Sequence, residues 1–261
     1  HIRSQRTFTN TVSNTAFRGF GGPQGMLAGE RIIEGVARAT GLDPLTVRKR
    51  NFYCGPERNI TPYFMEVDDF ILNELVDELE KTSDYWARRD AIREANAANP
   101  LILRGLALTP VKFGISFTAT WFNQAGALIH IYRDGSIHLN HGGTEMGQGL
   151  FVKVAQVVSH ALAVPIDQVG VSATPTDKVP NTSATAASSG ADLNAMAALN
   201  AANTLKHRLI SFAANHFGVD VESVRFADAT VFAGDHQLPF AEIVELAYLA
   251  RVQLSVTGFY R

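Results

Sequence analysis

The spacing of hydrophobic and polar residues divides the 261-residue chain into a helical first part and a mixed second part. In the first part, apolar residues recur at helical intervals. Pro23 and Pro44 suit the first turn of a helix, and Gly41 suits the left-handed residue that follows a helix end;. We predict an extended segment over 1–15, helices over 23–40 and 44–51, a loop over 54–64, and two helices within 66–98.

After Asn99-Pro100 the pattern changes to short apolar runs separated by turn residues and by longer helical stretches;. Asp134-Gly135, between two alternating runs, is a strong signal for a β-hairpin;. Strands mixed with helices predict an α+β fold with mixed sheets and packed helices. The predicted strands are 101–108, 113–120, 127–132, 136–140, 169–173 and 252–257, and the predicted helices are 150–163, 192–216 and 240–251.

Composition indicates a folded chain and argues against several classes of function. The chain is 46% hydrophobic and 18% charged with a net charge of −2, which fits a packed core and gives no basis for binding nucleic acid or a membrane surface;. No apolar run approaches the length of a bilayer span;. Cys54 is the only cysteine, so the chain offers no disulfide and no ligand set for zinc or an iron–sulfur cluster;. A cytoplasmic location fits this cysteine usage.

Three loops that are rich in glycine or small polar residues each lead into a predicted helix. The loop over 141–149 holds four glycines and Gln148. Free N–H groups and the helix dipole at such a junction can bind an anion, and glycine lets a ligand approach the backbone. A tight strand-to-helix turn without a ligand explains the same residues equally well. The other two loops are 16–24 and 182–190.

Individual side chains in these loops have two interpretations each. Arg18 suits an anion or a ring, or a surface ion pair, and Phe20 between two glycines suits a binding slot or a core;. His141 and Glu145 could form an acid–base pair, but structural roles are favoured because nothing in the sequence sets their distance;. The hydroxyls of 182–190 could hold an anion, although an ordinary polar loop is the commoner case;.

Several well-known catalytic motifs do not occur in the sequence. It contains no P-loop, no G-x-G-x-x-G after a strand, no G-x-S-x-G nucleophile turn and no H-E-x-x-H pair;. The sequence therefore does not support a P-loop nucleotide hydrolase, a nicotinamide-binding Rossmann domain, an α/β-hydrolase or a zinc protease.

Four ordered segments resemble the xanthine dehydrogenase/oxidase family of molybdenum hydroxylases. The resemblance covers nearly the whole chain and looks closest to the bacterial molybdenum-binding subunit. Residues 15–24 resemble the arginine loop of the family, residues 113–118 with 123–127 its second substrate-pocket segment, residues 141–149 its glutamine–glycine loop, and residues 179–183 with 185–188 a further cofactor loop.

The resemblance implies a molybdenum–molybdopterin cofactor and a partial molybdopterin-binding fold of the xanthine oxidase type. In such enzymes a molybdenum-bound hydroxide attacks an electron-poor purine carbon, and hydride passes to a sulfido ligand of the metal. The implied reaction is the oxidation of hypoxanthine and xanthine to urate. Electrons then leave through 2Fe–2S iron–sulfur clusters to FAD and NAD, which belong to a partner domain or subunit.

By motif position, the resemblance assigns roles to nine residues. Phe20 and Phe117 would sandwich the purine ring, and Thr118 would hydrogen-bond to it;. The cofactor-binding residues would be Arg18, Gly147, Gln148, Ala186, Ala187 and Ser188, of which Arg18 and Ala187 would lie near molybdenum without being its ligands.

The resemblance also implies that part of the site is missing from this sequence. The general base of the family is a glutamate in a Gly-x-Gly-Glu-Pro motif, and the only Gly-Glu pair here, Gly29-Glu30, lies on a predicted helix. The purine-binding glutamate and arginine and the glutamine–phenylalanine cofactor loop are expected upstream of His1, which begins neither a signal peptide nor an initiator methionine;. We therefore predict an internal fragment, with the end of a first molybdenum-binding domain over 1–60, a helical connector over 61–99 and the start of a second such domain over 100–261.

The expected activity belongs to the intact protein rather than to this chain alone. The intact protein is expected to be an oligomer that contains the remainder of the molybdenum subunit and a FAD and iron–sulfur subunit or domain. Without the general base, the 261-residue chain is expected to turn over no substrate;. An aldehyde oxidase-type molybdenum hydroxylase is the alternative within this class, and a non-catalytic ligand-binding domain is the alternative outside it.

Overall fold

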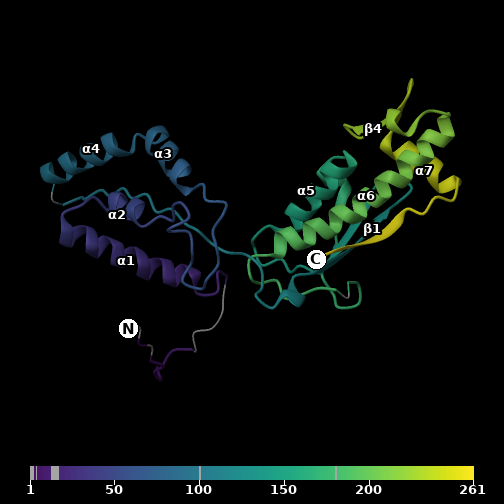
Figure 1. The fold of residues 1–261 in the computed structure, drawn as a ribbon. Helices are drawn as coiled ribbons and strands as arrows, with labels where there is room; N and C mark the ends of the chain where they lie inside the picture. Colours follow the sequence, from purple (N-terminus) through teal and green to yellow (C-terminus); the bar gives the residue numbers. More distant parts are fainter. Residues whose placement is uncertain (1–2, 4, 13–17, 100, 180) are drawn as a thin grey trace. The chain divides into compact units, whose positions relative to one another are not determined.

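The computed structural model describes residues 3, 5–12, 18–99, 101–179 and 181–261 (Figure 1). The chain divides into two compact units, His1–Phe113 and Gly114–Arg261. The first unit is mainly helical, and the second combines helices with two sheets, which confirms the predicted α+β fold. Within the described ranges, no helix has both the length and the apolar character that crossing a membrane requires.

Two successive pairs of helices build the first unit. α1 (Gly22–Thr40) packs against α2 (Pro44–Arg50), and α3 (Leu72–Thr82) packs against α4 (Tyr85–Ala98). The helix ends follow the predicted signals, since Pro23 lies in the first turn of α1 and Gly41 adopts a φ of 71° directly after it;. The predicted helices of this part are therefore confirmed. Its small buried core consists of Leu45, Phe52, Val76, Tyr85 and Leu108.

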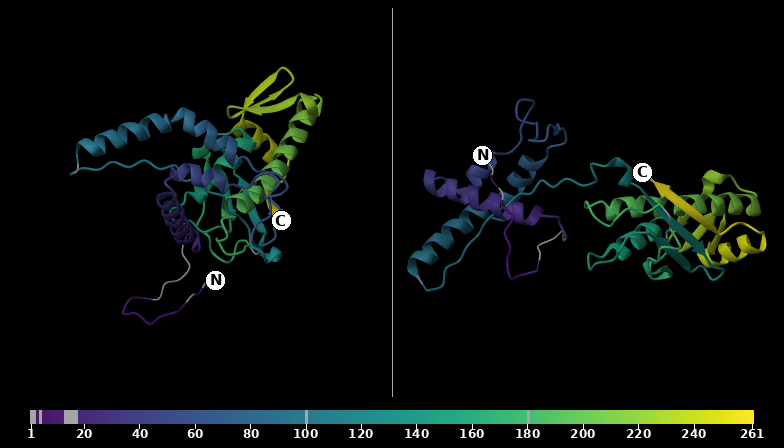
Figure 2. Two further views of the ribbon diagram at one scale, coloured as in Figure 1. Left: turned by 60° about the vertical axis from the view of Figure 1, so that its left-hand side comes forward. Right: turned by 90° about the horizontal axis from the view of Figure 1, so that it is seen from below.

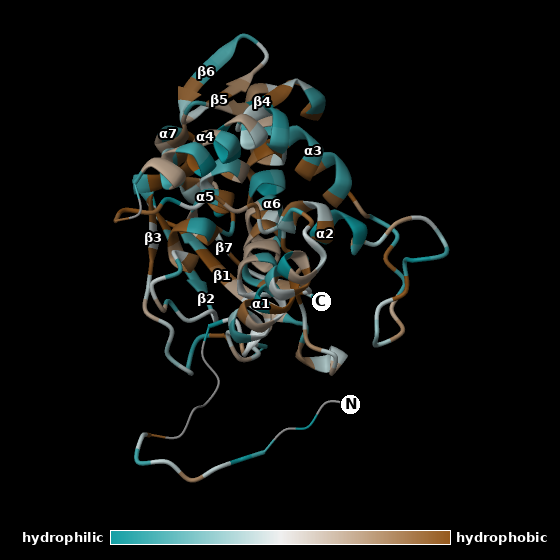
Figure 3. Cartoon of the chain, turned by 90° about the vertical axis from the view of Figure 1, so that its left-hand side faces the viewer, coloured by the Kyte–Doolittle hydropathy of each residue, from teal (hydrophilic) through white to brown (hydrophobic). Residues whose placement is uncertain are grey.

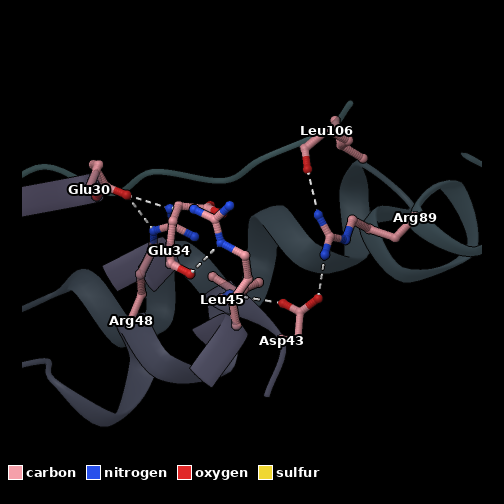
Figure 4. Close-up of polar contacts among 8 residues, drawn as sticks. Glu30, Glu34, Asp43, Leu45, Arg48, Arg89 and Leu106 are labelled. Carbon is pink, nitrogen blue, oxygen red and sulfur yellow. Dashed lines mark hydrogen bonds and ion pairs between the residues drawn. The ribbon is translucent and has the colours of Figure 1, made fainter. Parts of the chain in front are cut away.

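A buried arginine joins α1 to α2. The side chain of Arg48 on α2 is only 5% exposed, and its guanidinium pairs with the carboxylates of Glu30 and Glu34 on α1 (Figure 4). Removing the two glutamates would leave the buried charge of Arg48 without compensation;. The ion pairs therefore hold α1 against α2. Glu30 lies on a helix, α1, as predicted.

Asp43 joins the start of α2 to α4. One carboxylate oxygen accepts the N–H of Leu45 at 2.8 Å and so caps α2, and the other accepts a hydrogen bond from Arg89 on α4 at 2.6 Å (Figure 4);. Arg89 also donates to the carbonyl of Leu106 at 2.8 Å. The Asp43 carboxylate thus connects α2 to α4 and, through Arg89, to the segment that contains Leu106.

The strands predicted over 101–108 and 113–120 are wrong, because residues 101–120 contain no strand. Side chains bind this backbone in place of a neighbouring strand. The amide of Asn96 donates to the carbonyl of Arg104 at 3.0 Å and accepts its N–H at 2.8 Å. The apolar residues of the segment therefore produced a strand-like pattern without a sheet to join.

A four-stranded sheet with the order β3-β2-β1-β7 is the centre of the second unit. β1 pairs antiparallel with β2 and β7, whereas β2 pairs parallel with β3. Most residues along β1 are hydrophobic (Figure 3). The strands are β1 (Ala125–Ile131), β2 (Ile137–His141), β3 (Val169–Val171) and β7 (Ser255–Tyr260), so the predicted hairpin and the predicted strand after 169 are confirmed.

Two helices, α5 (Leu150–Leu162) and α6 (Gly190–Phe217), pack against this sheet and against each other (Figure 1). The alanine-rich face of α6 lets β7 approach closely, since a Cβ on Gly258 would lie 2.0 Å from the carbonyl oxygen of Ala197. A third helix, α7 (Phe240–Leu249), contributes to the same continuous core. The three helices predicted for this part are confirmed.

A second sheet was not predicted. It consists of the antiparallel strands β4 (Val224–Ala227), β5 (Thr230–Ala233) and β6 (His236–Pro239), and it packs against α6 (Figure 2). Each strand has four residues, which is too short for an alternating pattern to stand out;. Asp228 and Ala229 both adopt positive φ in the tight turn between β4 and β5;.

Two terminal predictions need correction or fall partly outside the structure. The last strand begins at Ser255 rather than at 252, because the N–H of Val252 donates to the carbonyl of Ala247 at the end of α7. Residue 3 and residues 5–12 form no strand, and the rest of the extended stretch predicted over 1–15 lies outside the described residues.

We expect Asp43→Ala to lower the free energy of unfolding by about 2 kcal/mol, because it removes the cap of α2 and the partner of Arg89. Asp43→Asn retains an oxygen acceptor for the cap and should show a smaller loss. Asp90→Ala is the control, since it removes an exposed pair with Arg93;. Urea unfolding followed by circular dichroism measures all three, and an equal loss in the control would contradict the assignment.

Candidate functional site

The loop over 141–149 carries its own anion at the start of α5. The carboxylate of Glu145 accepts the N–H groups of Gly147 at 2.8 Å, Gly149 at 3.0 Å and Phe151 at 3.1 Å. These bonds, with that of Phe151 contributing most, hold the pKa of Glu145 below its ordinary value;. The positive end of α5 is therefore occupied by a side chain of the loop itself.

Gln148 is also bound within this loop. Its amide nitrogen donates to the carbonyl of Thr144 at 2.8 Å, and its amide oxygen accepts the N–H of Met146. Gly147 and Gly149 adopt φ of 86° and 76°, a region that favours glycine;. Gly147 is exposed, and a Cβ added to it would meet no atom within 4 Å. The loop thus exposes backbone at Gly147, and both ends of the Gln148 amide are bound within it.

His141 is buried beneath the same loop. It is 2% exposed, and its Nδ1 accepts the N–H of Gly143 at 3.1 Å, whereas its Nε2 has no partner among the described residues. Burial lowers the pKa of His141 to about 4, although the nearby Glu145 carboxylate opposes this shift. His141 and Glu145 each bind backbone N–H groups, so the structural interpretation of both residues is favoured over an acid–base pair.

The loop over 182–190 differs, because it leaves the start of α6 open. Within the described ranges, the N–H groups of Gly190, Ala191 and Asp192 donate to no other group. Ala187 and Ser188 adopt φ of 55° and 57° directly before the helix. Free N–H groups at the start of a 28-residue helix can bind an anion;.

A small polar cavity lies beside this helix start. It is lined by residues of 182–185 and by the first turns of α6, including Asn194. Asn194 is 6% exposed, and its Oδ1 has no partner among the described residues. A buried amide oxygen without a partner is costly and marks a place for a donor from a ligand or a water molecule.

Hydrogen bonds join three loops of the second unit. The N–H of Thr144 donates to Oγ1 of Thr185 at 2.8 Å, and the N–H of Ser116 donates to the carbonyl of Ala187 at 2.9 Å. Close packing adds to these bonds, since a Cβ on Gly142 would overlap the side chain of Thr182. The loops 114–124, 141–149 and 181–190 therefore meet, and they bring together the predicted residues Phe117, Thr118, Gly147, Gln148, Ala186, Ala187 and Ser188.

The remaining predicted residues, Arg18 and Phe20, belong to the first unit. They form an exposed turn directly before α1, in which Phe20 adopts a φ of 46°. Gly22 lies against the ring of Phe113, and a Cβ there would be 2.6 Å from it. Thr15, Ala16 and Phe17 of this motif and Pro180 of the later one lie outside the described residues. The approach of Arg18 and Phe20 to the loops of the second unit stays a prediction.

The structure adds three residues that sequence reasoning missed or underrated. Glu145 closes α5, Asn194 carries an unpartnered oxygen beside α6, and Asn123 binds the backbone of Phe117 at 2.8 Å through both ends of its amide. A glutamate four residues before a glycine that starts a helix was a visible signal for the first. The described residues contain no group of three or more histidine, cysteine or acidic side chains placed to hold a metal ion.

Comparison with known proteins shows the family to which the chain belongs. Two family models described as molybdopterin cofactor-binding domains match residues 1–52 and 78–261. Xanthine dehydrogenase of Calliphora vicina is 46% identical over 97% of this chain, and xanthine dehydrogenase/oxidase of Gallus gallus is 44% identical over the same share. The chain spans 17% of the length of each of these relatives.

Solved structures show the same fold at lower identity. Quinoline 2-oxidoreductase from Pseudomonas putida 86 matches 94% of this chain with a TM-score of 0.68 and 23% identity, over 33% of its own length. A Cu,Mo-CO dehydrogenase matches 93% of this chain with a TM-score of 0.72 and 20% identity, again over 33% of its own length.

The fold and the matched segments define a molybdopterin-binding protein. The chain belongs to the molybdopterin cofactor-binding domain family, as a segment similar to xanthine dehydrogenases. The resemblance and the molybdopterin cofactor predicted from the four motifs are thereby confirmed. The predicted bacterial origin stays a prediction, since the similar sequences include insect, bird, fungal and slime-mould proteins.

We expect Glu145→Ala to expose the N–H groups of Gly147, Gly149 and Phe151, which should then exchange with deuterium faster. Glu242→Ala is the matched control. Glu242 is also a glutamate at the start of a helix, but the start of α7 has no hydrogen bond to a side-chain cap. In the wild type, the bonds of Glu145 are complete above its ordinary pKa and are lost as pH falls through its lowered value;. An unchanged exchange rate at the Gly147 amide in Glu145→Ala would show that the Glu145 carboxylate does not protect this N–H.

His141 predicts a separate loss of stability in mild acid. An unfolded histidine binds a proton below about pH 6.5, whereas His141 in the folded chain does so only near its pKa of about 4;. The folded state should therefore lose about 3 kcal/mol as pH falls from about 6.5 to about 4. Urea unfolding across this range measures how the free energy of unfolding depends on pH. This dependence should be weaker in His141→Asn, whereas the control His207→Asn, at an exposed position, should show the wild-type dependence.

Proposed function

We propose that this chain forms part of a molybdenum hydroxylase that oxidises hypoxanthine and xanthine to urate. The observation that carries the proposal is the meeting of three loops at the open start of α6, within a chain that belongs to a molybdopterin-binding family. The similarity to xanthine dehydrogenases over 97% of the chain supports the choice of a purine substrate.

The start of α6 fits the anionic end of molybdopterin better than the start of α5 does. At α6 the N–H groups are free among the described residues, and the unpartnered oxygen of Asn194 offers an acceptor nearby. At α5 the carboxylate of Glu145 already occupies the corresponding groups. Ala186, Ala187 and Ser188 would therefore hold the cofactor at α6, although Asp192 in the first turn adds one negative charge there;.

Gly147, Gln148 and Arg18 complete the proposed cofactor contacts. Gly147 is exposed and has no Cβ, so a ligand can approach its backbone even though its N–H is already bound to Glu145;. Gln148 would exchange its bond with Thr144 for a bond to the cofactor. When bound, the molybdenum–molybdopterin cofactor supplies oxygen transfer to the substrate and accepts its electrons.

Phe20, Phe117 and Thr118 would bind the purine. A purine ring between two phenyl rings gains stacking and edge-on contacts, and Thr118, which is exposed, can offer its hydroxyl as a donor or an acceptor;. Phe117 is half-buried, so its ring is supported on one side by the protein. The side chains would exclude water and orient the ring for attack at carbon.

The general base is not supplied by this chain. Its sequence contains no Gly-x-Gly-Glu-Pro motif, and Glu30 of its single Gly-Glu pair is bound to Arg48. The base, the second purine-binding face and half of the cofactor cradle would come from other parts of a longer cytoplasmic protein. In that protein, residues 1–60 would form the end of the first molybdenum-binding domain, and residues 100–261 would form the start of the second. Residues 61–99 would be the helical connector between the two domains.

Electrons would leave the cofactor through 2Fe–2S clusters to FAD and NAD in a partner domain or subunit. The intact protein would be an oligomer that contains these groups. The 261-residue chain by itself would oxidise no purine, because proton removal from the attacking oxygen has no base here.

The proposal is tested with the purified full-length protein. We expect bound molybdenum and molybdopterin, and urate formation from xanthine that exceeds oxidation of simple aldehydes. Preference for aldehydes would identify an aldehyde oxidase-type enzyme, and absence of molybdenum would identify a ligand-binding module of another kind.

Ala187→Asp tests the proposed cofactor cradle in the same protein. We expect the added carboxylate to repel the anionic cofactor and lower the molybdenum content at least about tenfold. Ala229→Asp is the matched control, because Ala229 has the same φ of 55° in the turn between β4 and β5. Metal analysis together with the unfolding temperature would separate cofactor loss from misfolding, and equal molybdenum in the two variants would contradict the cradle.

A further inference from the structure

We propose that Asn123 is a positioning residue that sets where the Phe117-Thr118 segment presents its side chains to the substrate. This inference rests on the proposed function, since it names the group that shapes the purine-binding segment. Asn123 does not face the substrate in this scheme but acts through the backbone of Phe117.

The amide of Asn123 binds both backbone polar groups of Phe117. Its Oδ1 accepts the N–H of Phe117 at 2.8 Å, and its Nδ2 donates to the carbonyl of Phe117 at 2.8 Å. Two bonds from one planar amide restrict rotation about the backbone of that residue more than a single bond would. They take the place of a neighbouring strand, which this segment lacks;.

The segment between the two residues is short and ordered. η1 (Thr120–Phe122) turns the chain back, and the N–H of Asn123 donates to the carbonyl of Thr120 at 2.9 Å. The ring of Phe122 packs on that of Phe117 with 5.4 Å between centroids. The amide bonds therefore close a loop that already supports one side of the Phe117 ring.

The residue before Phe117, Ser116, has a strained backbone conformation that the neighbouring hydrogen bonds hold in place. Ser116 adopts a φ of 79°, which a residue with a side chain rarely takes;. Its N–H donates to the carbonyl of Ala187, which itself has a φ of 55°. Such strained positions persist where surrounding bonds fix them. The Asn123 amide on one side and the Ala187 carbonyl on the other therefore tie the substrate segment to the proposed cofactor loop.

Loss of the amide should weaken substrate binding more than it slows the chemical step. Without it, the N–H and carbonyl of Phe117 would turn toward water, and the phenyl ring would occupy several positions. The productive position would still occur, so bound substrate would still react once aligned.

The experiment uses the full-length holoenzyme with Asn123→Ala, Asn123→Asp and the control Asn96→Ala. Asn96 binds the backbone of Arg104 through both ends of its amide in the same way, at 3.0 and 2.8 Å, but in the first unit. Its removal therefore reproduces the structural loss without touching Phe117. The measurements are kcat and KM for xanthine, molybdenum content, unfolding temperature and deuterium exchange at the Phe117 amide.

We expect Asn123→Ala to raise KM about tenfold, which corresponds to about 1.4 kcal/mol. Its kcat should stay within about threefold of the wild type, with unchanged molybdenum content and faster exchange at Phe117. Asn123→Asp retains an acceptor for the N–H of Phe117 but loses the donor, so its KM should be intermediate. Asn96→Ala should leave KM unchanged.

Two results would overturn the inference alone. One is an active wild type in which Asn123→Ala changes KM no more than Asn96→Ala does. The other is a parallel loss of kcat and molybdenum content, which would place Asn123 in folding or cofactor retention. A wild type that contains molybdenum but oxidises no purine would overturn the proposed function, and the inference with it.

Discussion

The loops that carry the proposed site keep their shape because side chains satisfy their backbone polar groups. A loop has no ladder of strand or helix bonds, so each buried or strained N–H and carbonyl needs another partner. Glu145 binds three N–H groups at the start of α5, and Asn123 binds both polar groups of Phe117. These bonds decide which backbone groups are left for a ligand. Among the described residues, those at the start of α6 are left.

This constraint gives the glycines of 141–149 two separate purposes. Gly147 and Gly149 adopt positive φ, which lets the loop wrap around the carboxylate of Glu145. Gly142 and Gly143 instead make room, because a Cβ on either would overlap Thr182 or Leu150. Close approach of the neighbouring protein segments, rather than of a ligand, therefore explains the second pair.

The parts of the fold with local signals could be predicted from the sequence. Gly41 ends α1 and Asp134-Gly135 turns the hairpin, because each needs only its own backbone conformation. The strands of 224–239 could not be predicted, since a strand of four residues is too short for an alternating pattern to stand out;. The motifs located the candidate loops, and Glu145 four residues before Gly149 was a visible signal for the occupied start of α5, but nothing in the sequence of 182–190 shows that the N–H groups at the start of α6 are free.

The hydrogen bonds between side chains and loop backbone also affect how the proposed site assembles. The bonds of Asn123, Glu145 and Thr185 are formed by protein atoms alone, so the three loops are ordered by folding rather than by binding. A cofactor or substrate then meets loops whose conformational entropy is already lost, which favours binding. Gln148 is the exception, because its amide must leave Thr144 to reach a ligand. Cofactor binding at this point would exchange one hydrogen bond for another, and the geometry of the loop, fixed by Glu145, would survive the exchange.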